Sequence, residues 1–359
     1  MKKSLFPLFL LLPVLLSAQI DTSAINFSVS GYAEPYYGYD LHEPADGNRP
    51  GFVYAHNRHN EFNLNIGFIK ATVNAQRFRG NFAIMAGTYT NANLSAEPGT
   101  LRNLYEANAG IKISKKHDLW VDAGIFGSHI GFESAVGKDC WTLTRSMMAE
   151  NSPYFESGAK LSYTSPSGQW FLSALALNGW QRIQRVPGNS LISGGTQIQF
   201  KPNSNITLNS STFFGTDKPD TIGLFRVFHN FYGIFQFNDQ FGLTLGFDTG
   251  WEENDRQGED LNFWYSPVMI ARYTINDRLT LAGRIEYYSD EKGVIISTAT
   301  SNGFQTLGFS ANLDVQVHKN AVWRLEGKLF NSKDEIFIDT NGGPSKSNAL
   351  LTTALAIWF

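Results

Sequence analysis

The chain has 359 residues, of which 33 are Gly and 14% are aromatic, and its formal net charge is −3 at pH 7. Its mean hydropathy is −0.21, and beyond the first twenty residues it has no run of 18 or more apolar residues, which excludes a helical membrane protein. Either the mature chain is soluble, or it crosses a membrane as strands. Nothing in the charge points to a nucleic-acid partner.

The N-terminal segment has the pattern of a secretory signal peptide. Lys2 and Lys3 precede an apolar stretch from Leu5 to Leu16, and small residues follow as far as Ala18. We expect residues 1–18 to be removed on export and residues 19–359 to form the mature barrel described below. An uncleaved anchor helix is the alternative, but the apolar stretch is short for one.

From Ile25 to the end, two alternating segments joined by a short polar turn form a repeating unit, and a longer polar stretch separates one unit from the next. The short turns are rich in Asn, Asp, Gly, Ser and Pro. They lie near residues 76–80, 114–117, 165–169, 201–205, 238–240, 276–278 and 318–320. These hairpins, with a leading and a closing strand, give about sixteen strands, and bacterial barrels require an even number.

Apolar residues recur at every second position of these segments, as in a strand with one apolar face. One such face is formed by Phe241, Leu243, Leu245, Phe247 and Trp251, and the opposite face by Gly242, Thr244, Gly246, Asp248 and Gly250. The same reasoning places Phe62, Leu64, Ile66 and Phe68 together on a lipid-facing side.

Alternation would also suit a soluble β-sandwich, so the choice depends on three further features. Segments of roughly 10 to 13 residues are long for a sandwich and suit tilted membrane strands. Long and short connections alternate, as the extracellular loops and periplasmic turns of outer-membrane barrels do. Aromatic residues gather near the ends of the segments, as interfacial girdles would require; they include Tyr36, Tyr37, Tyr39, Trp120, Trp170, Trp180, Phe263, Trp264, Tyr265, Tyr287, Tyr288 and Trp358.

Cys140 is the only cysteine, so the chain cannot form an internal disulfide. An exported chain of this size must then be stabilised by backbone pairing and packing, as a closed barrel is. The thiol lies far from the predicted cleavage site, which excludes a lipoprotein acylated at its first mature residue. We expect Cys140 to be a small buried residue, because no His lies nearby in sequence to activate it as a nucleophile.

The longest connection runs from Ser128 to Asn151, beyond the roughly 12 to 15 residues typical of structureless loops. In general porins a loop at this place folds into the barrel and narrows it, with acids facing bases across the opening. By this analogy we predict a constriction formed by Glu133, Asp139 and Arg145. The alternative is an external loop that packs on its neighbours through Trp141 and Met147.

The inward faces of the predicted strands carry charges of both signs. They could pair across strands, or they could line a water-filled channel and set its selectivity, and the two roles are compatible. The set comprises Asp122, Glu156, Lys160, Asp248, Arg284, Glu286, Asp314, Arg324, Glu326 and Lys328. We take Arg284, Glu286, Arg324, Glu326 and Lys328, with the three loop residues above, as candidates that line the pore or its constriction.

The last segment alternates through Leu351, Leu355 and Phe359. A closing strand must pair with the first one, because an open edge in lipid leaves backbone groups unsatisfied at a cost of several kcal/mol each. A strand that ends in Phe also resembles the signal read by the outer-membrane barrel assembly machinery. That resemblance implies this machinery and the outer-membrane lipid as partners.

The stretch from Asn151 to Gly158 and the stretch from Leu177 to Ile183, with its Asn-Gly-Trp-Gln segment, resemble the putative beta-barrel porin-2 family of Bacteroidetes-type bacteria. Residues 31–39 and 79–89 are similar to it as well, so the resemblance covers nearly the whole mature chain. It implies a porin-like protein in the outer membrane of a Gram-negative bacterium, without defining a solute. General porins associate in threes, so a homotrimer is one assembly to test.

Other chemistry has weak support in the sequence. Asp40, His42, Glu43, His56 and His59 carry groups that bind zinc, but their spacing matches no standard site, and we expect no metal and no cofactor. A G-x-S-x-G elbow is missing, which leaves His229 as the strand histidine to check for a barrel hydrolase. We therefore expect no enzyme.

The sequence predicts an all-β, transmembrane antiparallel barrel of about 16 strands that allows passive diffusion of small hydrophilic solutes or ions. A non-conducting barrel for binding or surface anchoring is the main alternative, followed by the hydrolase and by a soluble sandwich. The balanced charges do not indicate a preference for cations or anions.

Overall fold

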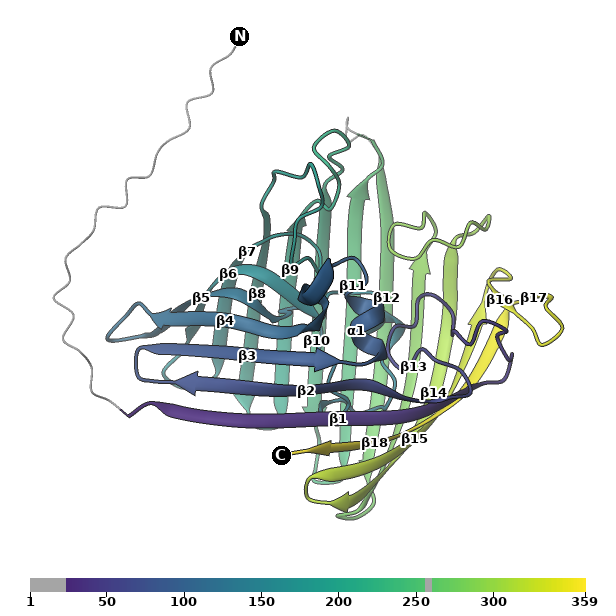
Figure 1. Cartoon of the computed structure of the whole chain (residues 1–359), viewed down its shortest axis with the longest axis horizontal. Coiled ribbons are helices and arrows are strands. Elements are labelled where there is room, and N and C mark those ends of the chain that lie inside the picture. Colours follow the sequence, from purple (N-terminus) through teal and green to yellow (C-terminus); the bar gives the residue numbers. More distant parts are fainter. Residues whose placement is uncertain (1–23, 256–259) are drawn as a thin grey trace, which may run out of the picture.

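Alternating residues and short polar turns produce long strands that close on themselves. The computed structural model describes residues 24–255 and 260–359, and within them sixteen strands form a closed barrel in which each strand pairs with its neighbour in the chain and β1 pairs with β18 (Figure 1). All these pairs are antiparallel, and the predicted fold and strand count are confirmed. The predicted signal peptide, residues 1–18, lies outside the described residues.

The barrel strands are β1 (Asn26–Asp40), β2 (Phe62–Asn74), β3 (Phe78–Ala86), β4 (Leu104–Lys112), β5 (Asp118–Gly127), β6 (Phe155–Thr164), β7 (Trp170–Leu177), β8 (Ser193–Asn203), β9 (Ile206–Gly215), β10 (Arg226–Gln236), β11 (Phe241–Glu253), β12 (Leu261–Thr274), β13 (Leu279–Asp290), β14 (Phe304–His318), β15 (Ala321–Ser332) and β18 (Ser347–Trp358). The loops contain the short elements α1 (Thr88–Asn93), η1 (Gly99–Asn103), η2 (Gly137–Asp139), α2 (Met147–Glu150), β16 (Phe337–Ile338) and β17 (Pro344–Ser345).

Short turns and long loops occupy opposite ends of the barrel, as predicted. The turns near 76–80 and 201–205 are shorter than expected, because β3 already begins at Phe78 and β8 continues to Asn203. The longest connection joins β5 to β6 and comprises residues 128–154. Residues 41–61, between β1 and β2, form the next longest loop.

The prediction for the inner and outer faces of β2 is wrong in part. Two residues of β2, Asn65 and Ile66, lie opposite the single residue Glu34 of β1, where the register shifts. Such a bulge turns both residues to one side and reverses the alternation beyond it. Ile66 is therefore fully buried, and Phe68 stacks on the buried Tyr32 instead of facing lipid.

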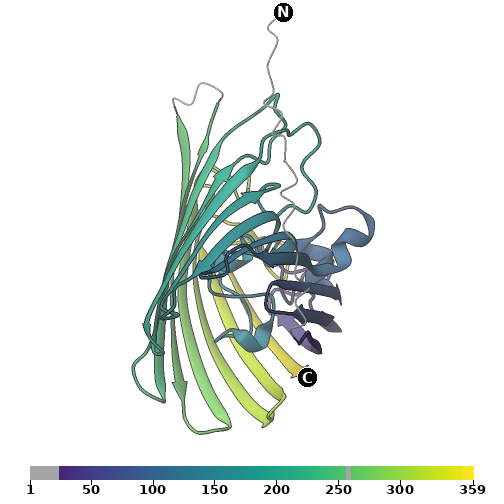
Figure 2. The same ribbon diagram turned by 90° about the vertical axis from the view of Figure 1, so that its left-hand side faces the viewer.

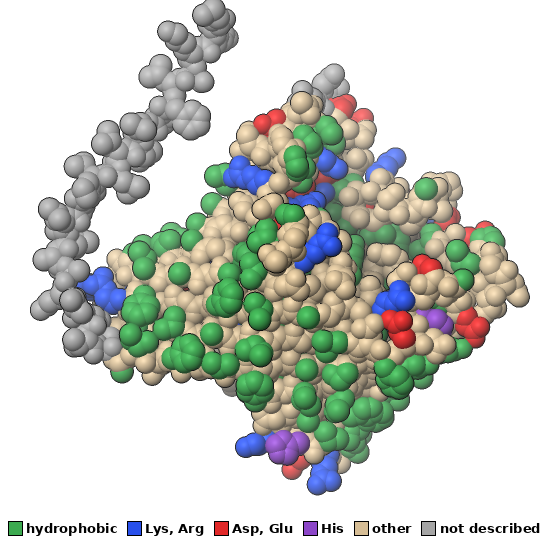
Figure 3. Space-filling view, viewed as in Figure 1, with side chains coloured by type: hydrophobic (Ala, Val, Ile, Leu, Met, Phe, Trp, Pro, Cys, Tyr) green, Lys and Arg blue, Asp and Glu red, His purple; other side chains and the backbone are tan. Residues whose placement is uncertain are grey.

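The outer wall of the barrel is apolar. Figure 3 shows hydrophobic side chains spread over the wall on the side that carries β1 to β4, while many of the charged side chains lie towards its ends. Large exposed apolar residues on other strands include Leu245, Phe247, Met269, Leu281 and Phe309. Within residues 24–255 and 260–359, no helix is long and apolar enough to span a membrane.

Four of the aromatic residues predicted at the interfaces, Tyr36, Trp120, Trp264 and Tyr288, are instead at most 9% exposed. Because aromatic residues occur on both faces of the strands, their position in the sequence alone could not separate the two locations. Trp264 and Tyr288 belong to an apolar cluster that also contains residues of the loops.

The first and last strands close the barrel. β1 and β18 pair from Tyr32 opposite Trp358 to Asp40 opposite Leu350. Beyond the end of β18, Phe359 exchanges two backbone hydrogen bonds with Gly31, with N···O distances of 3.2 and 3.1 Å. A side chain at Gly31 would collide with the Phe359 ring, since an ideal Cβ there would lie 2.4 Å from it.

The interior holds folded chain as well as strand side chains. Figure 2 shows chain between the two walls, with the blue strands β2 to β4 on one side and the green strands on the other. Phe52 and Val53 of the β1–β2 loop, with Ile130 and Met147 of the β5–β6 loop, pack in one cluster with wall residues. The sixteen strands therefore enclose two inward-folded loops, and the lumen is narrower than the strand count alone suggests.

Candidate functional site

The β5–β6 loop crosses the lumen and first binds the wall at β9 and β10. The hydroxyl of Ser211 donates to the carbonyl of His129 over 2.6 Å, and His129 Nε2 lies 2.8 Å from the carbonyl of Thr212. Next along the loop, the backbone N–H of Gly131 donates to Oδ1 of Asn230 over 3.1 Å. Burial lowers the pKa of His129 to about 4, so this imidazole is neutral at pH 7.

The middle of the loop binds the wall at β13 to β15 through its backbone N–H groups. Leu143 donates to Oδ1 of Asn312 over 2.9 Å, Thr144 donates to the Glu326 carboxylate over 2.5 Å, and Met147 donates to the Glu286 carboxylate over 2.5 Å. Carboxylates make strong hydrogen bonds with backbone donors. Side chains of the wall thus satisfy loop backbone that would otherwise be buried without a partner.

Cationic side chains of the wall donate hydrogen bonds to the loop's carbonyl groups. Arg324 donates to the carbonyl of Gly137 over 2.6 Å and to that of Cys140 over 3.0 Å, and its guanidinium also forms an ion pair with Asp314. Lys328 donates to the carbonyl of Arg145 over 2.9 Å. The loop is therefore held by charged strand residues of both signs.

A buried ion-pair network joins these anchors to each other. Arg284 lies 2.9 Å from Glu326, 3.3 Å from Glu286 and 3.7 Å from Glu133 of the loop, and Lys328 lies 2.9 Å from Glu286. All five side chains are at most 3% exposed. Buried charges are tolerated only when they are paired and hydrogen-bonded, and here the pairing requires that the loop is in place.

The three predicted constriction residues do not face one another across an opening in this structure. Glu133 accepts the N–H of Ser146, and burial raises the pKa of its carboxyl, against the effect of nearby Arg284. Arg145 is 1% exposed, and among the described residues its guanidinium donates to three carbonyl groups of its own loop. Asp139 is half exposed and pairs with Lys138 over 2.5 Å. Whether they act on solutes stays a prediction.

A residue that the sequence did not reveal links the two inward loops. The Glu150 carboxylate, at the end of α2, accepts the backbone N–H groups of Tyr54 and Ala55 over 3.1 and 3.2 Å. Burial raises the pKa of this carboxyl to about 7, although Lys328 and Arg145 act in the opposite direction. No local signal marked Glu150, because its partners are backbone groups almost a hundred residues away.

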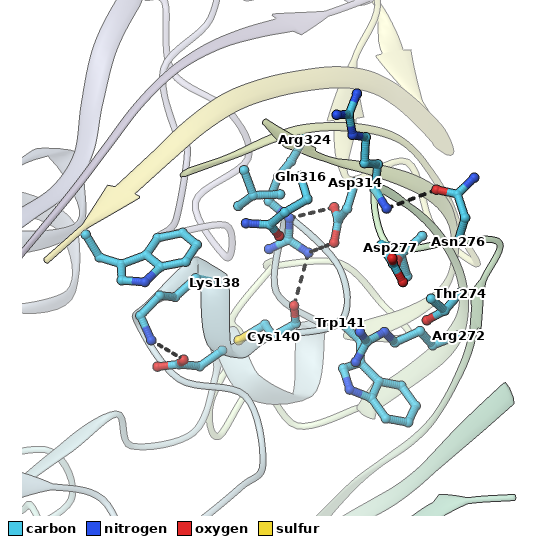
Figure 4. A pocket seen from close by; sticks show the side chains of 15 residues that line it. Lys138, Cys140, Trp141, Arg272, Thr274, Asn276, Asp277, Asp314, Gln316 and Arg324 are labelled. Carbon is cyan, nitrogen blue, oxygen red and sulfur yellow. Dashed lines mark hydrogen bonds and ion pairs between the residues drawn. The ribbon is translucent and has the colours of Figure 1, made fainter. Parts of the chain in front are cut away.

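Cavities lie on both sides of the loop. On the side of the short turns, a cavity of about 430 Å³ is lined by the loop tip and by the ends of β12, β14 and β15 (Figure 4). Figure 4 shows Arg272 beside Trp141, and Arg324 bound to Asp314. On the side of the long loops, two cavities of about 450 and 300 Å³ are lined by loop residues that include Tyr54 and Asn151.

The other inward charges are also in contact with protein. Arg79 forms a 2.5 Å ion pair with Asp122, Lys160 lies over the ring of Phe126, and Asn230 donates to Asp248 over 2.5 Å. Neither oxygen of the fully buried Glu156 carboxylate has a hydrogen-bond partner within the described residues. Most charged positions that the sequence placed inside thus serve the packing of the lumen.

The residues considered for metal binding have structural partners. His56 pairs with Glu34 over 2.9 Å, His59 Nδ1 accepts the N–H of Asp40, and Tyr39 donates to Glu43. In the part of the chain that the structure describes, no group of three His, Cys, Asp or Glu side chains could hold a metal ion.

His229 lies on the outer face of β10, where Nε2 is 2.8 Å from the hydroxyl of Ser210 on β9. A hydrolytic triad also needs a third group that orients the imidazole. Among the described residues, His229 has no second hydrogen bond, and its ring stacks on Phe231. Within the described residues, the Ser210–His229 pair therefore lacks the third group that a hydrolytic triad requires.

Comparisons with solved structures identify bacterial porins of the same fold. The chain is similar to an anion-selective porin from Comamonas acidovorans, with a TM-score of 0.61, 9% identity and coverage of 94% of this chain and 100% of that one. It is also similar to OmpT of Vibrio cholerae (TM-score 0.59, 7% identity, 95% and 99% covered) and to the outer membrane channel DcaP of Acinetobacter baumannii (0.55, 11%, 94% and 98%). At these identities the likeness shows the fold alone.

Sequence comparisons give two further results. No curated protein matches the chain. A family model described as "Putative beta-barrel porin-2, OmpL-like" matches residues 26–359, which extend from the first residue of β1 to beyond the end of β18.

Proposed function

The chain belongs to the Putative beta-barrel porin-2, OmpL-like family and is an outer-membrane porin by family and fold, and from this premise we propose that small hydrophilic solutes or ions diffuse through it passively. The resemblance seen in the sequence is thereby confirmed. The solute and the ion selectivity belong to the proposal.

One observation supports the proposal most directly. Cavities of about 430 and 450 Å³ lie at opposite ends of a closed barrel, and the β5–β6 loop with its wall contacts lies between them. Hydrophilic solutes need a path lined by polar groups, and Asp139, Arg272 and Asn276 line the cavity at the short-turn end. A barrel of 16 to 18 strands is wide enough for an aqueous channel, so displacement of the chain folded into the lumen would connect the cavities.

The test is single-channel conductance of the purified, refolded protein in a planar bilayer, under a salt gradient. We expect stable conductance steps, and we expect Asp139→Ala to move the reversal potential towards anion selectivity, because Asp139 is a half-exposed charge in the cavity wall. Glu133→Ala and Arg145→Ala, measured in parallel, test the remaining constriction candidates.

The matched control for this experiment is Asp239→Ala. Asp239 is an exposed acid in the turn between β10 and β11, at the same end of the barrel but outside the cavity wall. Its removal should leave the reversal potential unchanged. A correctly folded, heat-modifiable barrel that never conducts would reject the diffusion pore and favour a barrel for binding or surface anchoring.

Assembly in the outer membrane is a separate part of the proposal. We expect Phe359 to be recognised by the barrel assembly machinery, and its backbone pairing with Gly31 supports a role in closure. Phe359→Ala should lower the amount of folded barrel in the outer membrane while refolding from denaturant in detergent proceeds. Equal amounts of the two proteins in the membrane would contradict this role. A homotrimer also stays a prediction, and light scattering of the extracted protein would test it.

A further inference from the structure

The β5–β6 loop meets the wall in two chemically different ways. Towards β13 to β15 the contact consists of the ion pairs and charge-assisted hydrogen bonds described above. Towards β10 to β12 it is mainly apolar, and we call it the apolar seam. The seam consists of Phe132, Trp141 and Met148 of the loop packed against Ile234, Val268 and Ile270 of the wall.

Glycines of β11 make room for the loop's side chains in the seam. A Cβ at Gly242 would lie 2.8 Å from the ring of Trp141, and a Cβ at Gly246 would lie 2.7 Å from the ring of Phe132 and 3.0 Å from Met148. Real Cβ atoms do not approach other atoms so closely, so the two rings occupy space that any other residue of the wall would fill. The fit requires Gly at both positions.

A small cavity shows that the seam continues the cavity at the short-turn end. It measures about 40 Å³ and is lined by the apolar side chains of Phe132, Trp141, Ile234 and Ile270, together with Thr244, Glu133, Asp139 and Cys140. Asp139, Cys140 and Trp141 line both this space and the larger cavity of about 430 Å³. The Trp141 ring therefore stands at the junction, and Figure 4 shows it at the edge of the larger cavity.

We propose that the permeation path runs through the apolar seam, and that Phe132 and Trp141 close it. This inference rests on the proposed pore function and adds the route and the residues that control it. A narrow, apolar constriction excludes water and so blocks hydrated solutes. Because the opposite side of the loop is fixed by buried charges, the seam is where the loop can separate from the wall without leaving charges unpaired.

The first test removes the closing side chains. Trp141→Ala and Phe132→Ala should each raise the single-channel conductance about twofold or more, since a wider seam admits water. Gly246→Ala should act in the same direction, because the added methyl displaces the Phe132 ring from its place. All variants are first checked for a heat-dependent change in electrophoretic mobility, which indicates a folded barrel.

Two matched controls accompany these variants. Phe213→Ala removes a buried ring of β9 that packs against Trp180, away from the seam and outside the walls of the cavities described above. Gly327→Ala adds a methyl group where an ideal Cβ meets no atom within 4 Å. Both should conduct as the unmodified protein does. An increase with Phe213→Ala equal to that of the seam variants would overturn the route.

A second test leaves the packing of the rings intact. Thr244→Cys, combined with Cys140→Ala, places one thiol in the small cavity of the seam, and a methanethiosulfonate reagent that forms a mixed disulfide there should reduce the current. Ser310→Cys, in the same background, places the thiol on the wall beside Lys328, on the ion-paired side, and should leave the current unchanged. A reduced current with the thiol at position 310 and an unchanged current with the thiol at position 244 would place the permeation path on the ion-paired side of the loop.

The outcomes separate the two proposals. If the unmodified protein conducts and neither the seam variants nor the thiol at position 244 alters the current, the inference about the route is wrong and the pore function stands. If folded barrels of every variant are silent, the pore function itself fails.

Discussion

Replacing residues 129–153 by a four-residue Gly-Ser loop is expected to raise the single-channel conductance roughly threefold or more, because sixteen strands without an internal obstruction leave an aqueous channel. The replacement is compatible with the barrel, since Gly127 and Phe155 are paired and the N–H of Ser128 donates to the carbonyl of Tyr154 over 3.0 Å. A short hairpin can therefore join β5 to β6. Water would then solvate the wall charges that now bind the loop.

Shortening the loop of residues 216–225 in the same way provides the control. Its flanking residues Gly215 and Arg226 are also paired, but the connection belongs to the long-loop end and does not cross the lumen. We expect a small change in conductance. A folded barrel without residues 129–153 that conducts no better than the full chain would show that the β5–β6 loop is not the main obstruction.

Arg284→Met is expected to release the loop while the barrel remains folded. The substitution leaves Glu133, Glu286 and Glu326 buried around a neutral side chain, and breaking a buried ion pair in this way costs about 3–5 kcal/mol. It also removes the donors to Thr142 Oγ1 and to the carbonyl of Thr144, now 2.7 and 2.8 Å away. The strands themselves pair without the loop, so the loss should be confined to its docking.

Limited digestion with trypsin measures this release. The bonds after Lys138 and Arg145 lie in docked chain, because the wall binds the carbonyls of Gly137 and Arg145, and they should resist cleavage in the unmodified protein but not in Arg284→Met. Arg79→Met is the control, since it breaks a lumen ion pair with Asp122 that does not involve the loop. If Arg284→Met resisted trypsin as well as Arg79→Met does, the ion-pair network would not be what holds the loop.

The barrel was predictable because its signals are local. Alternation at a period of two and turns rich in Asn, Gly and Pro depend on neighbouring residues only, so the strand count and the turns followed from them. The face of Ile66 and Phe68 was not predictable, because a bulge opposite Glu34 is a relation between two strands. No residue type in β2 marks it.

The candidate site was predicted in its parts but not in its arrangement. Arg284, Glu286 and Glu326 lie on the inner face, as their alternation indicated. Besides pairing with one another they bind the loop, and contacts between residues some 140 to 180 positions apart leave no pattern in one sequence. Gly242 and Gly246 were recognised only as members of a non-apolar face. Their role depends on the rings of Phe132 and Trp141, which the fold brings to them.

Most hydrogen bonds between the wall and the β5–β6 loop involve backbone atoms of the loop. These atoms are the N–H groups of Leu143, Thr144 and Met147 and the carbonyls of Gly137, Cys140 and Arg145. Backbone groups are the same whatever the side chain. Related barrels with the same wall could therefore exchange the loop's other side chains, apart from Glu133 and the rings of the apolar seam, during evolution and keep the loop docked. Solute preference could then diverge by substitution in one short segment, without any change in the sixteen strands.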